Sequence, residues 1–93
     1  MSGYLVTIWH HKPMYRNGDL ESDTVKETES TFKTRREAKA YIEIRLDKLK
    51  NVKRQYHRGD TTSTCIGWTG KVWTNENTGE ECEEHYKFYL QKE

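Results

Sequence analysis

The stretch TRREAKAYIEIRLDKLKNVKRQYHRG, residues 34–59, decides the fold expected for this chain. It opens with Thr34 and Glu37, the pattern of a capping box, in which the Thr hydroxyl and the Glu carboxylate bond the first unpaired amides of a helix. Its apolar side chains gather on one side of a helical wheel, as in a helix that lies on a sheet, and a glycine follows its basic last turn. We therefore expect one long helix from Arg35 to about Arg58, roughly 36 Å long at 1.5 Å per residue.

Two strand-like segments precede this helix. Residues 4–10 are rich in β-branched and aromatic side chains and apolar on both alternating faces, as expected of a strand inside a sheet. Asn17 and Gly18 then form the dipeptide best suited to a type I′ turn, because both central residues of that turn need positive φ. The chain returns through the polar segment 23–31, which suits a sheet edge, where charged side chains discourage pairing with another chain.

Two further strands are expected after the helix. β-Branched and aromatic residues return from Thr61 to Thr74, interrupted by glycines that indicate a bulge or a bend. Residues 77–79 predict a short hairpin loop, and residues 81–91 alternate as a returning strand does.

These segments predict an α+β fold in a single small domain, residues 1–93. A β-hairpin, one long α-helix and a second β-hairpin follow one another, in the order ββαββ. The helix is expected to pack on one face of a mostly antiparallel sheet, because each element has an apolar face to bury.

The composition permits only a small core. Leu, Ile, Val and Phe make up 15 of 93 residues, and the net charge is +1. Aromatic side chains add apolar area, since each buries on the order of 150–250 Å². Cys65 and Cys82 are too few for a disulfide framework and are expected to be thiols. The start of the chain has neither a basic lead nor a long apolar run, so we expect a cytoplasmic protein with no membrane contact.

Charge is divided unevenly along the chain. From Thr34 to Arg58 nine Lys or Arg residues stand against three acidic ones, whereas from Asn75 to Glu93 six acidic residues stand against two Lys. A basic patch on a helix is typical of phosphate binding. The alternative is structural, because basic residues near a helix C-terminus complement its macrodipole and the acidic hairpin neutralises them. The candidate binding residues of this segment are Lys48, Lys50, Lys53, Arg54, His57 and Arg58.

Aromatic side chains form a second candidate surface. A helix on one face of a sheet leaves the other face open, and aromatic residues there stack on nucleic-acid bases or form the centre of a protein interface. The alternative for most of them is packing in a core that has few aliphatic residues. We select Trp68 and Trp73 as candidate binding residues.

The sequence shows no recognisable catalytic apparatus. Its four histidines lack the spacing that presents metal ligands from one element, so we expect no metal and no other cofactor. The acidic run at 80–84 is expected to form a solvated hairpin. There is no glycine-rich phosphate loop, nucleophile elbow or dinucleotide fingerprint, so we expect no enzymatic activity.

Residues 31–42, TFKTRREAKAYI, resemble the strand-to-helix junction in the arm-type DNA-binding domains of phage integrases. The resemblance consists largely of the capping box. Those domains lack the second hairpin predicted here, so no residue role is transferred from them.

We therefore expect a non-enzymatic macromolecule-binding protein. The leading interpretation is a small adaptor or inhibitor, of phage or mobile-element origin, that docks on a partner protein through its basic helix and aromatic sheet face. The alternative is a nucleic-acid-binding module in which the basic helix holds phosphates and exposed aromatic side chains stack on bases.

Overall fold

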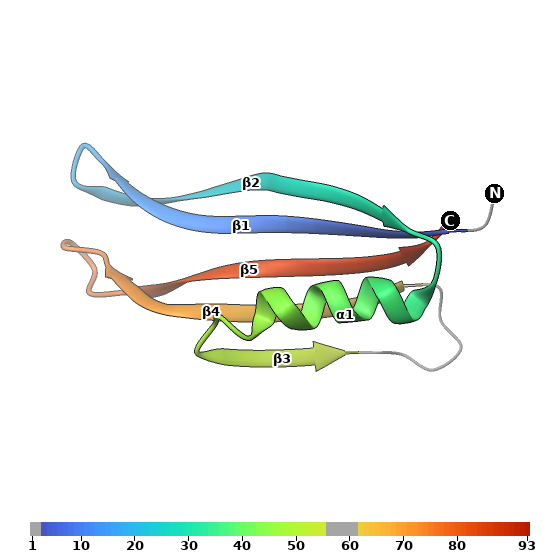
Figure 1. Cartoon of the computed structure of the whole chain (residues 1–93). Coiled ribbons are helices and arrows are strands. Elements are labelled where there is room, and N and C mark those ends of the chain that lie inside the picture. The colour runs from blue at the N-terminus through green and yellow to red at the C-terminus, as the bar shows by residue number, and fades with distance from the viewer. Residues whose placement is uncertain (1–2, 56–61) are drawn as a thin grey trace.

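The computed structural model describes residues 3–55 and 62–93 and shows five strands and one helix in this part of the chain (Figure 1). Their order along the chain is β1, β2, α1, β3, β4 and β5. The bounds are Tyr4–Arg16 for β1, Asp19–Phe32 for β2, Arg35–Leu46 for α1, Asn51–Gln55 for β3, Thr62–Thr74 for β4 and Glu81–Lys92 for β5.

All strands belong to one antiparallel sheet with the spatial order β2-β1-β5-β4-β3. The last strand, β5, lies in the centre and pairs with both β1 and β4, so it joins the two hairpins into one sheet (Figure 1). The polar strand β2 forms one edge, as its composition predicts, and the short strand β3 forms the other.

The predicted ββαββ fold with one long helix is wrong, because the helix ends at Leu46 and the chain then forms a fifth strand. The predicted start is confirmed: Thr34 is the N-cap, and its hydroxyl accepts a hydrogen bond from the Glu37 amide at 3.2 Å. The helix is therefore about 18 Å long at 1.5 Å per residue, half of the expected length.

The early end of α1 has a physical reason in the pairing of the next segment. The Leu49 amide bonds the Leu46 carbonyl at 2.9 Å, and the Lys50 amide bonds the Trp68 carbonyl of β4 at 2.9 Å. From there β3 pairs along β4, so backbone groups that would continue the helix bond the sheet instead. Leu49 and Val52 still pack against the core, so the apolar stripe attributed to a long helix is buried through a turn and a strand.

The first hairpin closes at the predicted turn. Asn17 and Gly18 both have positive φ, 54° and 83°, as a type I′ turn requires. The pairing of β1 with β2 shifts between Ile8 and Trp9, which leaves Glu27 as the extra residue of a β-bulge. A bulge re-aims side chains, and here Glu27 reaches toward the helix.

The core lies between α1 and one face of the sheet. Strand residues alternate between the two faces, so every second residue of β1 and β5 lies on the side of the sheet that carries the helix. The buried hydrophobic residues are Val6, Ile8, Ala38, Ile42, Leu46, Cys65, Phe88 and Leu90.

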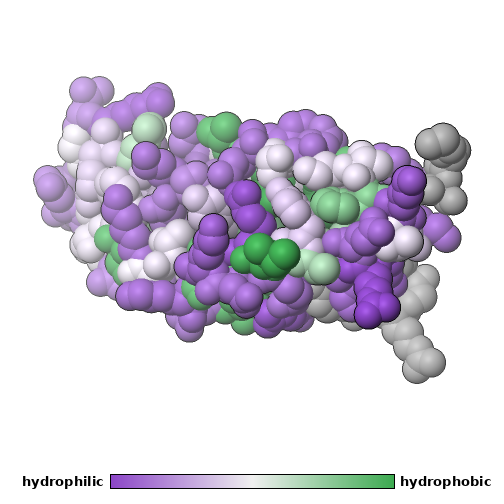
Figure 2. All heavy atoms as spheres, in the orientation of Figure 1, coloured by the Kyte–Doolittle hydropathy of each residue, from purple (hydrophilic) through white to green (hydrophobic). Residues whose placement is uncertain are grey.

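The helix covers only part of this face. Strand β1 has 13 residues and spans about 43 Å at 3.3 Å per residue, more than twice the length of α1. The molecule is correspondingly elongated, with extents of 50 × 22 × 21 Å. On the side that carries α1 the surface is largely hydrophilic with small separate hydrophobic spots (Figure 2). No helix in the described ranges is long and apolar enough to cross a membrane.

The two hairpins meet again at their far ends. The ring of Tyr15 lies 5.7 Å from that of Trp73, and the Tyr15 hydroxyl donates to the Thr74 carbonyl. The Asn77 side-chain amide donates to the Gly18 carbonyl at 3.4 Å. These contacts connect the hairpin tips beyond the point where β1 and β5 stop pairing.

Leu49 packs over Gly67 of β4, so a substitution at Gly67 tests whether the chain turns from α1 into β3 as described. A Cβ atom at Gly67 would lie 2.2 Å from Leu49 Cδ1 and 3.1 Å from Leu46 Cδ2. We predict that Gly67→Ala lowers the free energy of unfolding by about 1–3 kcal/mol through overpacking. The loss should be at most half as large in a Leu49→Ala background, where the closer clash, with Leu49, is absent and only the approach to Leu46 remains. Urea unfolding measures both, and an equal cost in the two backgrounds would contradict the packing described.

Candidate functional site

The face of the sheet opposite α1 carries the first candidate surface. Residues paired across neighbouring antiparallel strands share a face. One such row crosses all five strands at a single level: Trp9 of β1 lies opposite Lys26 of β2 and Lys87 of β5, and Ile66 of β4 lies opposite Lys87 and Lys53 of β3. The row therefore presents a lysine on every second strand. We name it the lysine row: Lys26, Trp9, Lys87, Ile66 and Lys53.

An aromatic hollow borders the lysine row on the side of the chain termini. The hollow has a volume of about 420 Å³, and Trp9 and Tyr89 contribute its aromatic lining. The Lys26 ammonium lies 6.0 Å from the centre of the Trp9 ring. Trp9 and Tyr89 are both partly exposed to solvent.

A second group of rings borders the lysine row on the other side. His11, His85 and Trp68 lie opposite one another on β1, β5 and β4. The His11 and His85 rings are stacked at 4.5 Å, and the Trp68 and His85 rings are 6.3 Å apart. His85 and Tyr89 are four residues, or about 13 Å, apart on β5 with Lys87 between them, whereas Trp9 and His11 are only two residues, or about 6.6 Å, apart on β1.

The part of this face around the lysine row is predominantly positive, whereas Glu83 and Glu81 follow on the same face further along β5. Three lysines, Lys26, Lys53 and Lys87, stand against Glu29 in the four rows from Thr31 to Thr24. Glu29 pairs with Lys26 at 3.5 Å, an exposed contact that contributes little. Lys53 and Lys87 make no ion pair with another residue of the described ranges.

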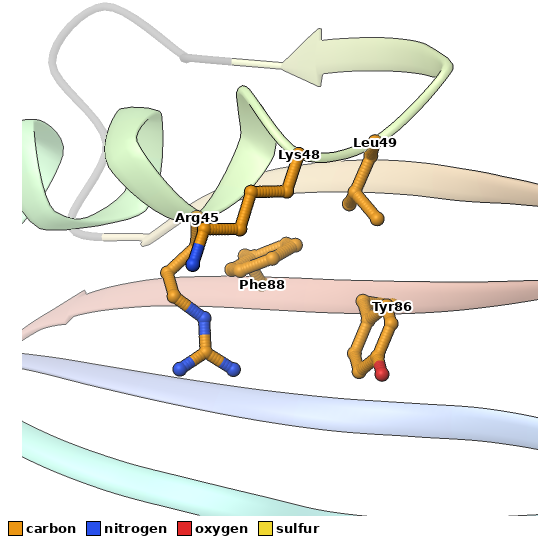
Figure 3. Close-up of a pocket in the computed structure, with 5 residues that line it drawn as sticks. All are labelled: Arg45, Lys48, Leu49, Tyr86 and Phe88. Carbon is orange, nitrogen blue, oxygen red and sulfur yellow. The ribbon is translucent and has the colours of Figure 1, made fainter.

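The helix side carries a second candidate, a cleft of about 230 Å³ at the end of α1. Its lining residues are Arg45, Lys48, Leu49, Tyr86 and Phe88 (Figure 3). Arg45 and Lys48 extend from the helix side over β5, and the rings of Phe88 and Tyr86 face them from that strand (Figure 3). The cleft lies where α1 ends, and beyond it the helix no longer covers this face of the sheet.

Acidic groups adjoin this cleft. The Arg45 guanidinium pairs with the Glu27 carboxylate at 3.3 Å. The His10 imidazole contacts Glu84 at 2.6 Å and stacks on Tyr86, with ring centres 4.3 Å apart and planes 9° apart. Burial raises the pKa of the Tyr86 hydroxyl, the charges of Glu27 and Glu84 raise it further, and Arg45 lowers it.

The basic residues predicted from the sequence do not form one surface. Lys48 lines the cleft, whereas the Lys50 side chain lies against Gly70. Lys53 belongs to the lysine row on the opposite face. Arg54, the next residue, points to the helix side and makes two contacts with the Glu43 carboxylate, of 2.6 and 2.5 Å. Alternation along β3 thus separates side chains that a helix would have brought together.

The remaining predicted residues have different positions. Trp68 lies on the helix-free face, as described above. Trp73 packs at the hairpin tips between Tyr15 and Lys71, whose ammonium is 4.7 Å from the Trp73 ring centre. His57 and Arg58 lie outside the described residues.

The described residues offer no metal centre and no disulfide. The described ranges contain no group of three or more His, Cys, Asp or Glu side chains placed to hold a metal ion. Neither Cys65 nor Cys82 forms a disulfide. Comparisons with protein-family models, with curated proteins and with solved structures find no match to this chain. Function is therefore inferred from the chemistry of the two surfaces.

Sequence reasoning did not select several residues of these surfaces. Lys26 and Lys87 were missed because each is isolated in its own strand and joins the lysine row only through long-range pairing. Trp9 and Tyr89 carried a signal, since each lies out of phase with the apolar side chains that face the helix.

The environment of His11 predicts a pH dependence of stability. Burial lowers the pKa of His11 below its ordinary value of 6.5, and the charges of His85, His10 and Lys87 lower it further. The unfolded chain therefore takes up this proton at a higher pH than the folded chain does. The free energy of unfolding should then fall as the pH drops from about 6.5 through the folded pKa.

Titration of the His11 imidazole by NMR, together with urea unfolding of the wild type and His11→Gln, measures this effect. We expect a midpoint below 6.5 and a weaker acid destabilisation in the variant. A His11 midpoint at or above 6.5 would contradict the packing of this ring.

Proposed function

We propose that this chain is a non-enzymatic binding protein that holds single-stranded nucleic acid on the helix-free face of its sheet. The single observation that carries this proposal is the lysine row bordered by aromatic rings on both sides. Binding of single strands combines cationic contacts to the phosphates with aromatic side chains on which the bases stack. Both components are present here on one uncovered surface.

The aromatic groups support the proposal through their placement. Tyr89 stands on one side of Lys87 along β5, the ring pair of Trp68 and His85 stands on the other, and Trp9 lies directly opposite Lys87 within the row. A strand laid across this surface would stack bases on either side of Lys87 while its phosphates pass between them. Stacking of this kind contributes about 1–3 kcal/mol per base and requires no particular base sequence.

The positions of the lysines favour a nucleic acid over a protein as the partner. Neighbouring strands are about 4.8 Å apart, so Lys26, Lys87 and Lys53 repeat at intervals of about 10 Å across the sheet. A phosphate backbone offers charges at regular intervals to such a row. The centres of protein interfaces, by contrast, are depleted in lysine. The expected protein partner and the expected nucleic acid both relied on a long basic helix as well as on aromatic side chains of the sheet, and α1 ends at Leu46, so the lysine row takes the place of that helix in this proposal.

Salt dependence tests the electrostatic part. We expect the purified chain to bind a labelled oligothymidine of about twelve nucleotides, with an affinity that falls by a log–log slope of about 0.7 per phosphate contact. Lys87→Gln should weaken binding and reduce this slope by about 0.7. Lys33→Gln removes the same charge in the connection between β2 and α1 and should leave both quantities unchanged. Fluorescence anisotropy at several salt concentrations measures them.

Replacement of the rings tests the stacking part. Tyr89→Leu keeps an apolar side chain but removes the π face, so we expect a loss of about 1–3 kcal/mol in binding free energy, whereas Tyr89→Phe should bind nearly as the wild type does. Trp9→Leu should behave as Tyr89→Leu, and circular dichroism checks that each variant is folded.

Absence of binding at low ionic strength, or equal effects of Lys87→Gln and Lys33→Gln, would overturn the proposal. Capture of a partner protein whose binding is lost in Trp9→Leu and insensitive to salt would assign the same face to protein docking instead.

A further inference from the structure

The cleft at the end of α1 belongs to neither the lysine row nor the aromatic hollow. It lies on the opposite side of the sheet, between the last helical turn, the following turn and β5 (Figure 3). Its volume of about 230 Å³ lies just below the range of roughly 300–1,000 Å³ that drug-sized ligands occupy. Only a small molecule fits it.

Two cations with unused hydrogen-bonding capacity meet in the cleft. Arg45 contacts Glu27 through a single nitrogen at 3.3 Å, although a guanidinium carries five N–H donors. Lys48 makes no ion pair with another residue of the described ranges. An anion with two or more oxygens would therefore find donors from both side chains, in the geometry that Arg offers to carboxylates and phosphates.

The rest of the cleft is lined by aromatic and aliphatic side chains. Leu49 supplies hydrocarbon surface, and Phe88, which is only 1% exposed, contributes to the wall of the cleft. The Tyr86 ring adjoins them and continues outward as a nearly parallel stack with His10, 4.3 Å away. Aromatic surfaces of this kind bind flat rings by offset stacking.

We propose that this cleft binds a small organic anion in which a flat ring carries a phosphate or a carboxylate. The anionic oxygens lie between Arg45 and Lys48, and the ring lies against Tyr86. This site is separate from the proposed nucleic-acid surface and does not depend on it.

Glu27 acts as the competitor of the ligand. The β-bulge turns this residue toward the helix, where its carboxylate occupies the Arg45 nitrogen that faces β2. The pair is partly exposed, with side-chain exposures of 34% for Arg45 and 40% for Glu27, so an incoming anion displaces it at small cost. Removal of the Glu27 charge should therefore strengthen binding.

Titration with four probes tests the proposal: adenosine monophosphate, benzoate, inorganic phosphate and the neutral benzyl alcohol. Changes in the Tyr86 ring resonances report binding. We expect saturable binding of adenosine monophosphate or benzoate, and the two probes distinguish a phosphate from a carboxylate ligand. Inorganic phosphate and benzyl alcohol should bind at least about fivefold more weakly, because phosphate lacks the flat ring and benzyl alcohol lacks the anionic group.

Matched variants separate this site from a merely structural role of the cations at a helix end. Lys48→Gln should weaken binding of the ring anion about five- to tenfold, whereas Glu27→Gln should strengthen it. Lys33→Gln and Lys87→Gln remove the same charge elsewhere and should leave it unchanged. Absence of saturable binding, weaker binding in Glu27→Gln, or a loss in Lys87→Gln as large as in Lys48→Gln would each overturn the proposal.

Discussion

The pairing of β5 with both β1 and β4 is the constraint on which the rest of the structure depends. The last strand of the chain enters the centre of the sheet and forms two ladders at once, so it holds together hairpins that are distant in sequence. Side chains alternate along β5 between the face of the sheet that carries α1 and the opposite face. Phe88 and Leu90 are buried under the helix, while Tyr89 and Lys87 point away from it. Both candidate surfaces follow from this strand.

The sequence alone predicted the features that depend on residues close to one another in the chain. The capping hydroxyl of Thr34 fixes the start of α1, and the positive φ of Asn17 and Gly18 fixes the first turn. Gly70, with φ of 85°, lies within the register shift of β4, where a bulge was expected. Each of these features involves neighbours a few residues apart, so propensity and turn geometry decide them with little influence from the rest of the fold.

The end of the helix depended on long-range contacts that no local pattern contains. Leu46, Leu49 and Val52 repeat every third residue, which favours a continuing helix. The same three side chains reach the core when the chain turns at Leu49 and runs along β4. The absence of a side chain at Gly67 makes room for Leu49, and this partner is 18 positions further along the chain. Tertiary pairing therefore overrides an amphipathic pattern that either structure satisfies.

The wrong prediction of a helix beyond Leu46 also explains why the candidate site was only partly predicted. On a helix, the cluster of basic residues after Asp47 would have formed one patch. On a strand, alternation sends Lys53 to the helix-free face and Arg54 to Glu43 on α1. The positive charge of the helix-free face comes instead from single lysines on three strands that are separate in sequence. A short helix also leaves the cleft beside Tyr86 open, because a helix extended past Leu46 would have covered it. The position of Lys53 in the lysine row and the open cleft on the helix side therefore both depend on the replacement of the helical continuation by β3.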